Sequence, residues 1–429
     1  MNRRWMSLLA FVAWCFYLQP QALTGAEAKP HSLADYAREM REQLRAKVLP
    51  YWYDTAIDKT AGGYLLADDL AGPRRATEKQ LVSQTRMIWG FAHAHLKGFS
   101  TPERDCRQAA AQGYHFLTNH FLDLKNGGYY WKMDLDGKVT NDRKILYGQS
   151  FAVYALVEYH RASGDAQALR LALDLYHLIQ KRGHDGANSG WLEHFTRDWT
   201  PIMAPGPGTE VEVAGYKSAN AHLHWMEALS ELYAVTQDRE VKKSLAEAID
   251  INAIWFYPAN PGKSAFHRQP DWKPVRDQRS QGLSYGHNVE FAWLMVRAQM
   301  VLGKKPSWSH FDAHIRHALK FGYDHERGGL YSLGQDDQPA TNTNKVWWVQ
   351  AEMLAALTDA LKHKPDPQYE EALKQLLDFV VLHQTSPDGI WLDTVSAEGK
   401  PIAPGKAHSW KANYHDVRAM VKFVGAFGL

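Results

Sequence analysis

The sequence predicts an all-α protein with the fold of an (α/α)6 barrel, in which twelve helices form six pairs and the long links carry short β-hairpins. Two observations lead to this prediction. Helix start and stop signals recur along the chain and mark repeated pairs of helices, and one such pair cannot bury its apolar face alone. A phrase built on Asp and Gly also returns at nearly equal steps, as Asp58…Gly62-Gly63-Tyr64, Asp123…Gly127-Gly128-Tyr129, Asp185…Ser189-Gly190-Trp191, Asp324…Gly328-Gly329-Leu330 and Asp388-Gly389-Ile390.

The step between the third and fourth phrases leaves room for one more copy, which we expect to have decayed between residues 256 and 270. A closed ring is favoured over an open solenoid because neither terminal unit has an unusually polar cap. No change of composition marks a second domain.

Capping residues set the helix boundaries. Thr101-Pro102 is expected to open the third helix, Asp238 to cap the seventh and Gly303 to end the eighth, because Pro suits the first helical position and Gly the position after the last. The helices are expected at about 32–53, 77–97, 102–121, 145–163, 166–182, 217–236, 239–256, 285–302, 308–322, 342–363, 367–384 and 410–427.

Alternate helices differ in how their apolar residues are arranged. The helix that starts near His287 is apolar almost all round, whereas the helix capped by Asp238 has one apolar side. A helix of the first kind is buried, and one of the second kind covers a core. We therefore expect even-numbered helices to line the inside of the ring and odd-numbered helices the outside, with the long links on one rim.

The N-terminus is a separate segment. Arg3 and Arg4 precede an apolar run, and Ala26-Glu27-Ala28 resembles a cleavage site, which predicts a secretory signal peptide over residues 1–28. An uncleaved membrane anchor is the less favoured alternative, because the run is short for a span. Residues 29–429 then form one domain, exported to the periplasm or the extracellular space, with no membrane contact after cleavage. Cys106 is the cysteine that remains, so no intrachain disulfide is expected.

Composition narrows the class of partner. The 429 residues carry a formal net charge of +2 with scattered charges, which gives no case for nucleic-acid binding. The 16 tryptophans favour a flat, partly apolar small molecule such as a sugar ring, although a large well-packed core also explains them. We expect a monomer or a weak homodimer.

Polar and aromatic residues gather near the N-terminal ends of the even-numbered helices. His287 and Glu290 stand three apart, on one face of the eighth helix. Trp348 is expected to face away from the axis. A lone His on an apolar helix is more often a core residue, but three at equivalent places of a repeat favour a shared site. The ends converge in a ring, which predicts one cavity that also holds Arg86, Tyr147, Asn220, His224, Trp347, Trp410 and His415.

Different chemistries fit these residues unequally. His224-x-x-Glu227 and His287-x-x-Glu290 repeat one spacing, but a metal is not expected because the further carboxylates of di-iron bundles are missing. A glycosidase needs two carboxyl groups across the scissile bond, for which Glu227 and Glu290 are the candidates. Paired histidines instead suit reversible proton transfer near neutral pH, with Arg86 stabilising an enediolate oxyanion. A non-catalytic sugar-binding protein is a further alternative.

These residues carry a resemblance to a known family. From Trp52 to Ala419 the chain resembles the N-acylglucosamine 2-epimerase family, which includes cellobiose 2-epimerases, mannose 2-epimerases and aldose–ketose isomerases. The resemblance is strongest to the cellobiose and mannose 2-epimerase branch. The motifs that carry it are Lys217-Ser218-x-Asn220-x-His222-Leu223-His224-x-x-Glu227-Ala228, Gly286-His287-x-x-Glu290, Lys345-x-Trp347-Trp348-x-Gln350-Ala351-Glu352 and Trp410-Lys411-x-x-Tyr414-His415.

The resemblance implies an (α/α)6 barrel that epimerises, at C2, the reducing-end aldose of a mono- or disaccharide without a metal or an organic cofactor. It implies that His287 and His415 form the acid/base pair around C2 and that Glu290 orients His287. If one His returns the proton to C1 the product is a ketose, so an aldose–ketose isomerase is the alternative. Asn288 and Ala221 depart from the family pattern, which has Asp and Thr there.

The resemblance also assigns the remaining residues. His224 would help to open the sugar ring or stabilise the intermediate, and Arg86 would bind the developing oxyanion. The sugar subsites would be formed by Tyr147, Asn220, Trp347, Trp410 and Glu227.

Overall fold

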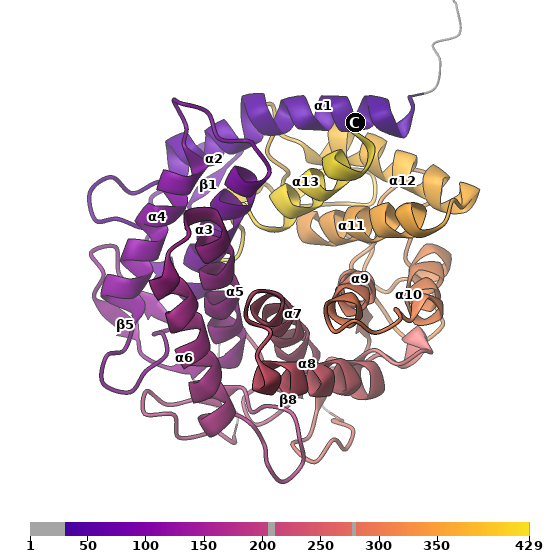
Figure 1. Ribbon diagram of the computed structural model, residues 1–429. Coiled ribbons are helices and arrows are strands. Elements are labelled where there is room, and N and C mark those ends of the chain that lie inside the picture. The colour runs from indigo at the N-terminus through magenta and orange to yellow at the C-terminus, as the bar shows by residue number, and fades with distance from the viewer. Residues whose placement is uncertain (1–30, 205–210, 277–279, 429) are drawn as a thin grey trace, which may run out of the picture.

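The computed structural model describes residues 31–204, 211–276 and 280–428. In these ranges twelve helices form two concentric rings (Figure 1), which confirms the predicted (α/α)6 barrel. Each inner helix packs against the next, and the last packs against the first. The inner helices are α3 (Leu81–Leu96), α5 (Leu146–Ser163), α7 (Ala219–Thr236), α9 (Tyr285–Val301), α11 (Trp347–His363) and α13 (His415–Phe427).

The outer helices cover this ring from outside. The first runs through α1 (Leu33–Gln43), a π-helical turn and α2 (Leu49–Ala56), and α1 packs on α13, which joins the two ends of the chain. The others are α4 (Cys106–Phe116), α6 (Ala166–Arg182), α8 (Arg239–Ile251), α10 (Trp308–Phe321) and α12 (Pro367–Phe379). Four of the six outer helices contain π-helical turns, which sequence reasoning did not foresee: Leu44–Val48, Leu117–Phe121, Asn252–Phe256 and Val380–Gln384.

Short antiparallel strands occupy the long links, as predicted. Five inner helices begin directly after a strand: β3 (Lys79–Gln80), β6 (Lys144–Ile145), β8 (Lys217–Ser218), β10 (Leu283–Ser284) and β12 (Lys345–Val346). Each of these pairs with a strand of the following link, for example Lys144 with Phe195. The remaining strands are β1 (Asp68–Asp69), β2 (Gly72–Pro73), β4 (Lys132–Met133), β5 (Val139–Asn141), β7 (His194–Phe195), β9 (His267–Arg268), β11 (Leu333–Gly334), β13 (Thr394–Val395), β14 (Pro401–Ala403) and β15 (Gly405–Ala407).

The repeated Asp–Gly phrase fixes the start of four of the six inner helices. Lys345 Nζ donates to Asp324 Oδ2 at 2.8 Å and to the Gly328 carbonyl at 2.7 Å, entirely away from solvent. Five residues on, the Gln350 side chain pairs with both backbone groups of Leu330, at 2.7 Å each. The same Lys–Asp pairing recurs in three other units, as Lys79–Asp58, Lys144–Asp123 and Lys217–Asp185.

Four predicted helix starts were wrong. The second helix begins at Leu81 instead of residue 77, because β3 precedes it. The third helix begins at Cys106 instead of residue 102, because the Asp105 carboxylate accepts hydrogen bonds from the first free backbone N–H groups of that helix. The tenth and twelfth helices begin five residues later than expected, at Trp347 and His415, because β12 precedes the former and a turn closed by the bridge between His408 and Lys411 precedes the latter. His415 is therefore the first residue of its helix.

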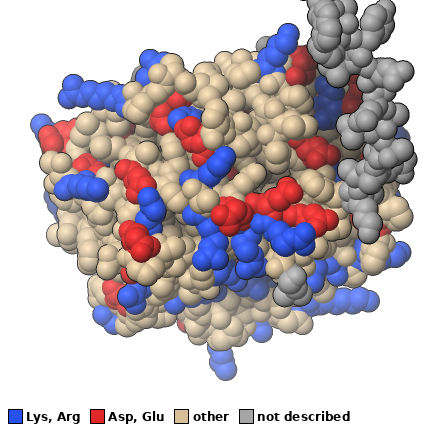
Figure 2. Space-filling view, turned by 90° about the horizontal axis from the view of Figure 1, so that it is seen from above, with Lys and Arg blue, Asp and Glu red and all other residues tan. Residues whose placement is uncertain are grey.

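The predicted signal peptide, residues 1–28, lies outside the described residues. Within the described ranges, no helix combines the length and apolar character that a bilayer crossing requires. On the face seen in Figure 2, Lys and Arg side chains are interspersed with Asp and Glu.

Candidate active site

A cavity of about 300 Å³ opens where the N-terminal ends of the inner helices meet. These ends carry partial positive charge, which favours a negatively charged group between them. Nine of the ten predicted site residues line the cavity, and Glu227 does not. The lining residues are Arg86, Tyr147, Val211, Asn220, His224, His287, Glu290, Trp347, Trp348, Trp410 and His415.

His415 is held by a carboxylate. Its Nδ1 lies 2.7 Å from Glu352 Oε1, and both side chains are buried. This contact leaves Nε2 as the ring nitrogen available to the cavity. The ring also lies 5.9 Å from the Trp348 ring, measured between centroids. The prediction that Trp348 faces away from the cavity was therefore wrong.

His287 lacks such a partner. Its backbone N–H donates to Ser284 Oγ, the N-cap of α9, and its ring packs on Trp348 with centroids 4.7 Å apart. Among the described residues, no hydrogen bond reaches either ring nitrogen. Within these residues the expected pairing of the His287 ring with Glu290 is also absent. Glu290 Oε1 accepts from Arg418 at 2.9 Å instead.

His224 and Arg86 lie on the opposite wall. His224 Nδ1 is 2.9 Å from Glu227 Oε2, so Glu227 orients this imidazole from behind and does not reach the cavity. The Arg86 guanidinium donates to the Tyr147 hydroxyl at 2.8 Å and to the Trp410 carbonyl at 2.9 Å. A fixed cation thus faces the cavity.

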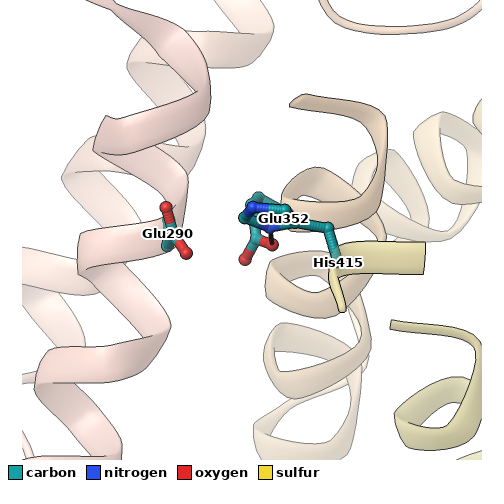
Figure 3. A group of neighbouring side chains, drawn as sticks. All are labelled: Glu290, Glu352 and His415. Atoms are coloured by element: carbon teal, nitrogen blue, oxygen red, sulfur yellow. Dashed lines mark hydrogen bonds and ion pairs between the residues drawn. The ribbon is translucent and has the colours of Figure 1, made fainter. Parts of the chain in front are cut away.

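Arg418 connects the carboxylates beneath the cavity. Its guanidinium donates to Glu352 at 2.7 Å, to Glu290 at 2.9 Å and to Glu227. Figure 3 shows Glu290 reaching from α9 toward Glu352 and His415. One ligand atom from each of these three residues lies within 4.8 Å of the others. The guanidinium already supplies the positive charge that a metal would bring, so an ion-pair network accounts for the cluster.

Burial sets the protonation of the three imidazoles. Burial lowers the pKa of His287 to about 3. It also lowers the pKa of His224 and takes the pKa of His415 well below its ordinary value, although the carboxylate partners of these two rings oppose the shift. All three rings are therefore neutral near pH 7 and able to accept a proton.

Sequence reasoning missed Glu352 and Arg418. A positional signal existed for Glu352, which lies seven residues after Lys345, just as Arg86 follows Lys79 and His224 follows Lys217. Arg418 follows His415 by three residues, the spacing from His287 to Glu290. Val211 also lines the cavity, and no comparable signal in the sequence pointed to it.

Comparison with known proteins agrees with this geometry. The family model of N-acylglucosamine 2-epimerase (GlcNAc 2-epimerase) matches residues 62–419. The chain belongs to the N-acylglucosamine 2-epimerase family.

Relatives within the family cover nearly the whole chain. A cellobiose 2-epimerase from Bacteroides fragilis is 27% identical over 90% of this chain and 98% of its own length. The structure of a cellobiose 2-epimerase from Spirochaeta thermophila is 31% identical, with a TM-score of 0.82 over 92% of this chain and 97% of that one. A D-mannose isomerase from Marinomonas mediterranea is 23% identical over 87% of this chain and 93% of its own. The chain is thus an isomerase-class enzyme, a sugar epimerase or isomerase that acts on a small molecule.

Proposed function

We propose that this enzyme epimerises the reducing-end aldose of a mono- or disaccharide at C2. The observation that supports the proposal best is that two neutral imidazoles, His287 and His415, line one cavity together with the Arg86 guanidinium. Removal of a proton next to a carbonyl needs a base and a cation for the developing oxygen charge. The cavity supplies both.

In the proposed reaction the sugar ring opens, with His224 assisting. One histidine takes the C2 proton, and the C–H electron pair forms the C1–C2 double bond of a cis-enediolate. Arg86 and the helix N-termini stabilise the oxygen charge. The proton then returns to the other face of C2, either after rotation about the C1–C2 unit or from the opposite histidine, and the ring closes. Each positioned base supplies roughly 10²- to 10⁴-fold in rate.

A glycosidase fits the site less well. That reaction needs two carboxyl groups across the bond that is cleaved. Of the two candidates, Glu290 lines the cavity and Glu227 lies behind His224. Aldose–ketose isomerisation uses the same groups and differs in the carbon that receives the proton.

Proton NMR of cellobiose, mannose and glucose in deuterium oxide tests the proposal. We expect deuterium at C2 together with the C2 epimer of at least one of these sugars. A ketose product would assign the isomerase outcome instead. Absence of exchange with every aldose, or release of a free sugar from cellobiose, would overturn the proposal.

We also propose that the chain is exported. The support is the N-terminal pattern of Arg3, Arg4, an apolar run and Ala26-Glu27-Ala28. The intact mass of the protein purified from its host should correspond to a chain that begins near Lys29. A mass that includes residues 1–28 would contradict this.

A further inference from the structure

The carboxyl groups beneath the cavity outnumber the cations that face them. Glu227, Glu290 and Glu352 share the single guanidinium of Arg418, and all four residues are at most 4% exposed. Three buried carboxylates around one buried cation would leave uncompensated negative charge, which is costly in a medium of low dielectric constant. A proton on one of the three carboxyl groups would relieve this charge.

Hydrogen-bond partners indicate which carboxyl group is neutral. Glu352 accepts from His415, Arg418 and the Trp293 indole, which occupies both of its oxygens. Glu290 has one donor, Arg418, on Oε1, and its buried Oε2 has no partner.

Glu227 is satisfied in the same way as Glu352. It accepts from His224 on Oε2 and from Tyr414 and Arg418 on Oε1. Five of the six carboxyl oxygens in this group therefore have donors, and Glu290 Oε2 is the exception.

We propose that Glu290 is a neutral carboxylic acid in the resting enzyme and that its Oε2–H donates to the carbonyl oxygen of the open-chain sugar. Glu290 lines the sugar cavity together with the three histidines, so the unpartnered oxygen belongs to a side chain that a substrate can reach. The inference rests on the proposed function for its substrate and on the carboxyl cluster for its protonation state.

The electrostatics of the cluster agree. Burial and the neighbouring Glu352 carboxylate raise the pKa of Glu290 well above its ordinary value. Burial opposes ionisation of Glu352 too, but the Arg418 guanidinium and the hydrogen bond from His415 outweigh it and lower the pKa of Glu352 to about 2. The other titratable and charged groups near Glu290 are Arg86, Tyr147, His224, Glu227, Tyr257, His287, Tyr414, His415 and Arg418.

With Glu290 as a neutral acid, every proton that moves in the reaction has a donor and an acceptor. A neutral histidine takes the C2 proton, and the C–H electron pair forms the C1–C2 double bond. The carbonyl π pair becomes the charge on the enediolate oxygen, which then takes the Oε2 proton of Glu290 and gives a neutral enediol, an imidazolium and a carboxylate. When the imidazolium returns its proton to C2, O1 returns its proton to Glu290. A carboxylic acid kept neutral by an apolar site is a known kind of hydrogen-bond donor to a developing enolate.

Two matched variants test the protonation state without a substrate. Glu290→Gln replaces a neutral acid by a neutral amide that can still accept from Arg418, so we expect the melting temperature to stay unchanged. Glu352→Gln replaces the charged acceptor of hydrogen bonds from His415, Arg418 and Trp293 by a neutral amide, so we expect a melting temperature lower by several degrees. Equal losses in the two variants would overturn the proposal.

Infrared spectroscopy of the same proteins provides a direct readout. We expect the carbonyl band of a protonated carboxylic acid in the wild type, shifted in deuterium oxide, and its loss in Glu290→Gln. No difference between the wild type and Glu290→Gln would refute the inference.

Activity then separates the two proposals. Because an amide cannot transfer a proton, Glu290→Gln should lose roughly 10²- to 10⁴-fold in C2 exchange. Full activity in this variant would refute the donation to the sugar. If the band and the melting temperatures behave as expected but no aldose exchanges, the proposed function fails while the neutral Glu290 stands.

Discussion

The two ends of the barrel axis offer a direct comparison. The front cavity, at the N-terminal ends of the inner helices, measures about 300 Å³, whereas a rear cavity toward their C-terminal ends measures about 700 Å³. Both are lined by tryptophan, histidine, arginine and glutamate. The rear cavity is lined by Trp89, His93, Leu96, Lys97, Tyr154, Glu158, Arg161, Glu227, Ser230, Glu231, Trp293, Leu294, Arg297, Arg418, Val421, Lys422 and Gly425.

The difference lies in how the charged groups are paired. In the rear cavity Glu158 binds His93 at 2.6 Å and Arg161 at 3.0 Å, and Glu231 binds Arg161 and Arg297. In the front cavity, among the described residues, the ring nitrogens of His287 and Oε2 of Glu290 have no hydrogen-bond partner. A buried polar group without a partner lowers stability, and such groups are typical of functional sites. An unpartnered carboxyl oxygen and an unpartnered imidazole therefore distinguish the catalytic end better than volume does.

The largest expected difference between the two cavities follows from removing one imidazole from each in separate variants. His415→Ala should reduce C2 exchange by roughly 10²- to 10⁴-fold, because the site loses one of its bases. His93→Gln is the matched control on α3 in the rear cavity, and it should retain exchange within about twofold. Proton NMR in deuterium oxide measures both rates. Equal losses would show that the rear cavity takes part in catalysis.

The front imidazoles should also give stability a pH dependence. Because burial lowers the pKa of His287 to about 3, the unfolded chain binds more protons than the folded chain between about pH 6.5 and pH 3. Stability should therefore fall as pH falls through this window, by up to about 1.4 kcal/mol per pH unit for each such imidazole.

Denaturant unfolding of wild type and His287→Gln over a pH series measures this slope. The variant should show a shallower slope, because one neutral buried imidazole has been removed. Identical slopes would mean that His287 is solvated in the folded enzyme.

The smallest effect concerns two tyrosines. Tyr147→Phe in the front cavity removes the hydroxyl that accepts from Arg86. It should lower kcat/KM about fivefold, which corresponds to a loss of about 1 kcal/mol of transition-state stabilisation. Tyr154→Phe in the rear cavity removes a hydroxyl that has no hydrogen bond among the described residues, and it should leave kcat/KM unchanged. Steady-state kinetics on the aldose identified by NMR compares them. A larger loss in Tyr154→Phe would reverse the assignment of the two ends.

Much of the fold could be predicted because the residues that define each repeat lie close together in the sequence. The Asp–Gly phrases at Asp58, Asp123 and Asp324 predicted the pairing of helices, and the structure shows why the phrase recurs, since a buried lysine binds each of these aspartates. The start of α4 at Cys106 was missed because Asp105 competes with Thr101 as N-cap, and the sequence does not rank two capping residues so close together.

The candidate site was predicted in outline for the same reason. Equivalent positions in a repeat must converge when the ring closes, and this predicted His224, His287 and His415 around one cavity. Glu227 was misplaced because residues three apart on a helix share a face at different depths, so it supports His224 from behind.

By itself the sequence determined the helices, their alternation between inner and outer positions and the identity of the groups that meet on the axis, because these depend on spacing along one segment. Only the tertiary structure decided which carboxylate holds which imidazole. Glu352 comes from α11 while His415 and Arg418 come from α13, and these contacts between separate helices depend on the angle and depth at which the helices pack. That geometry leaves Glu290, a residue that lines the cavity, with an unpartnered buried oxygen.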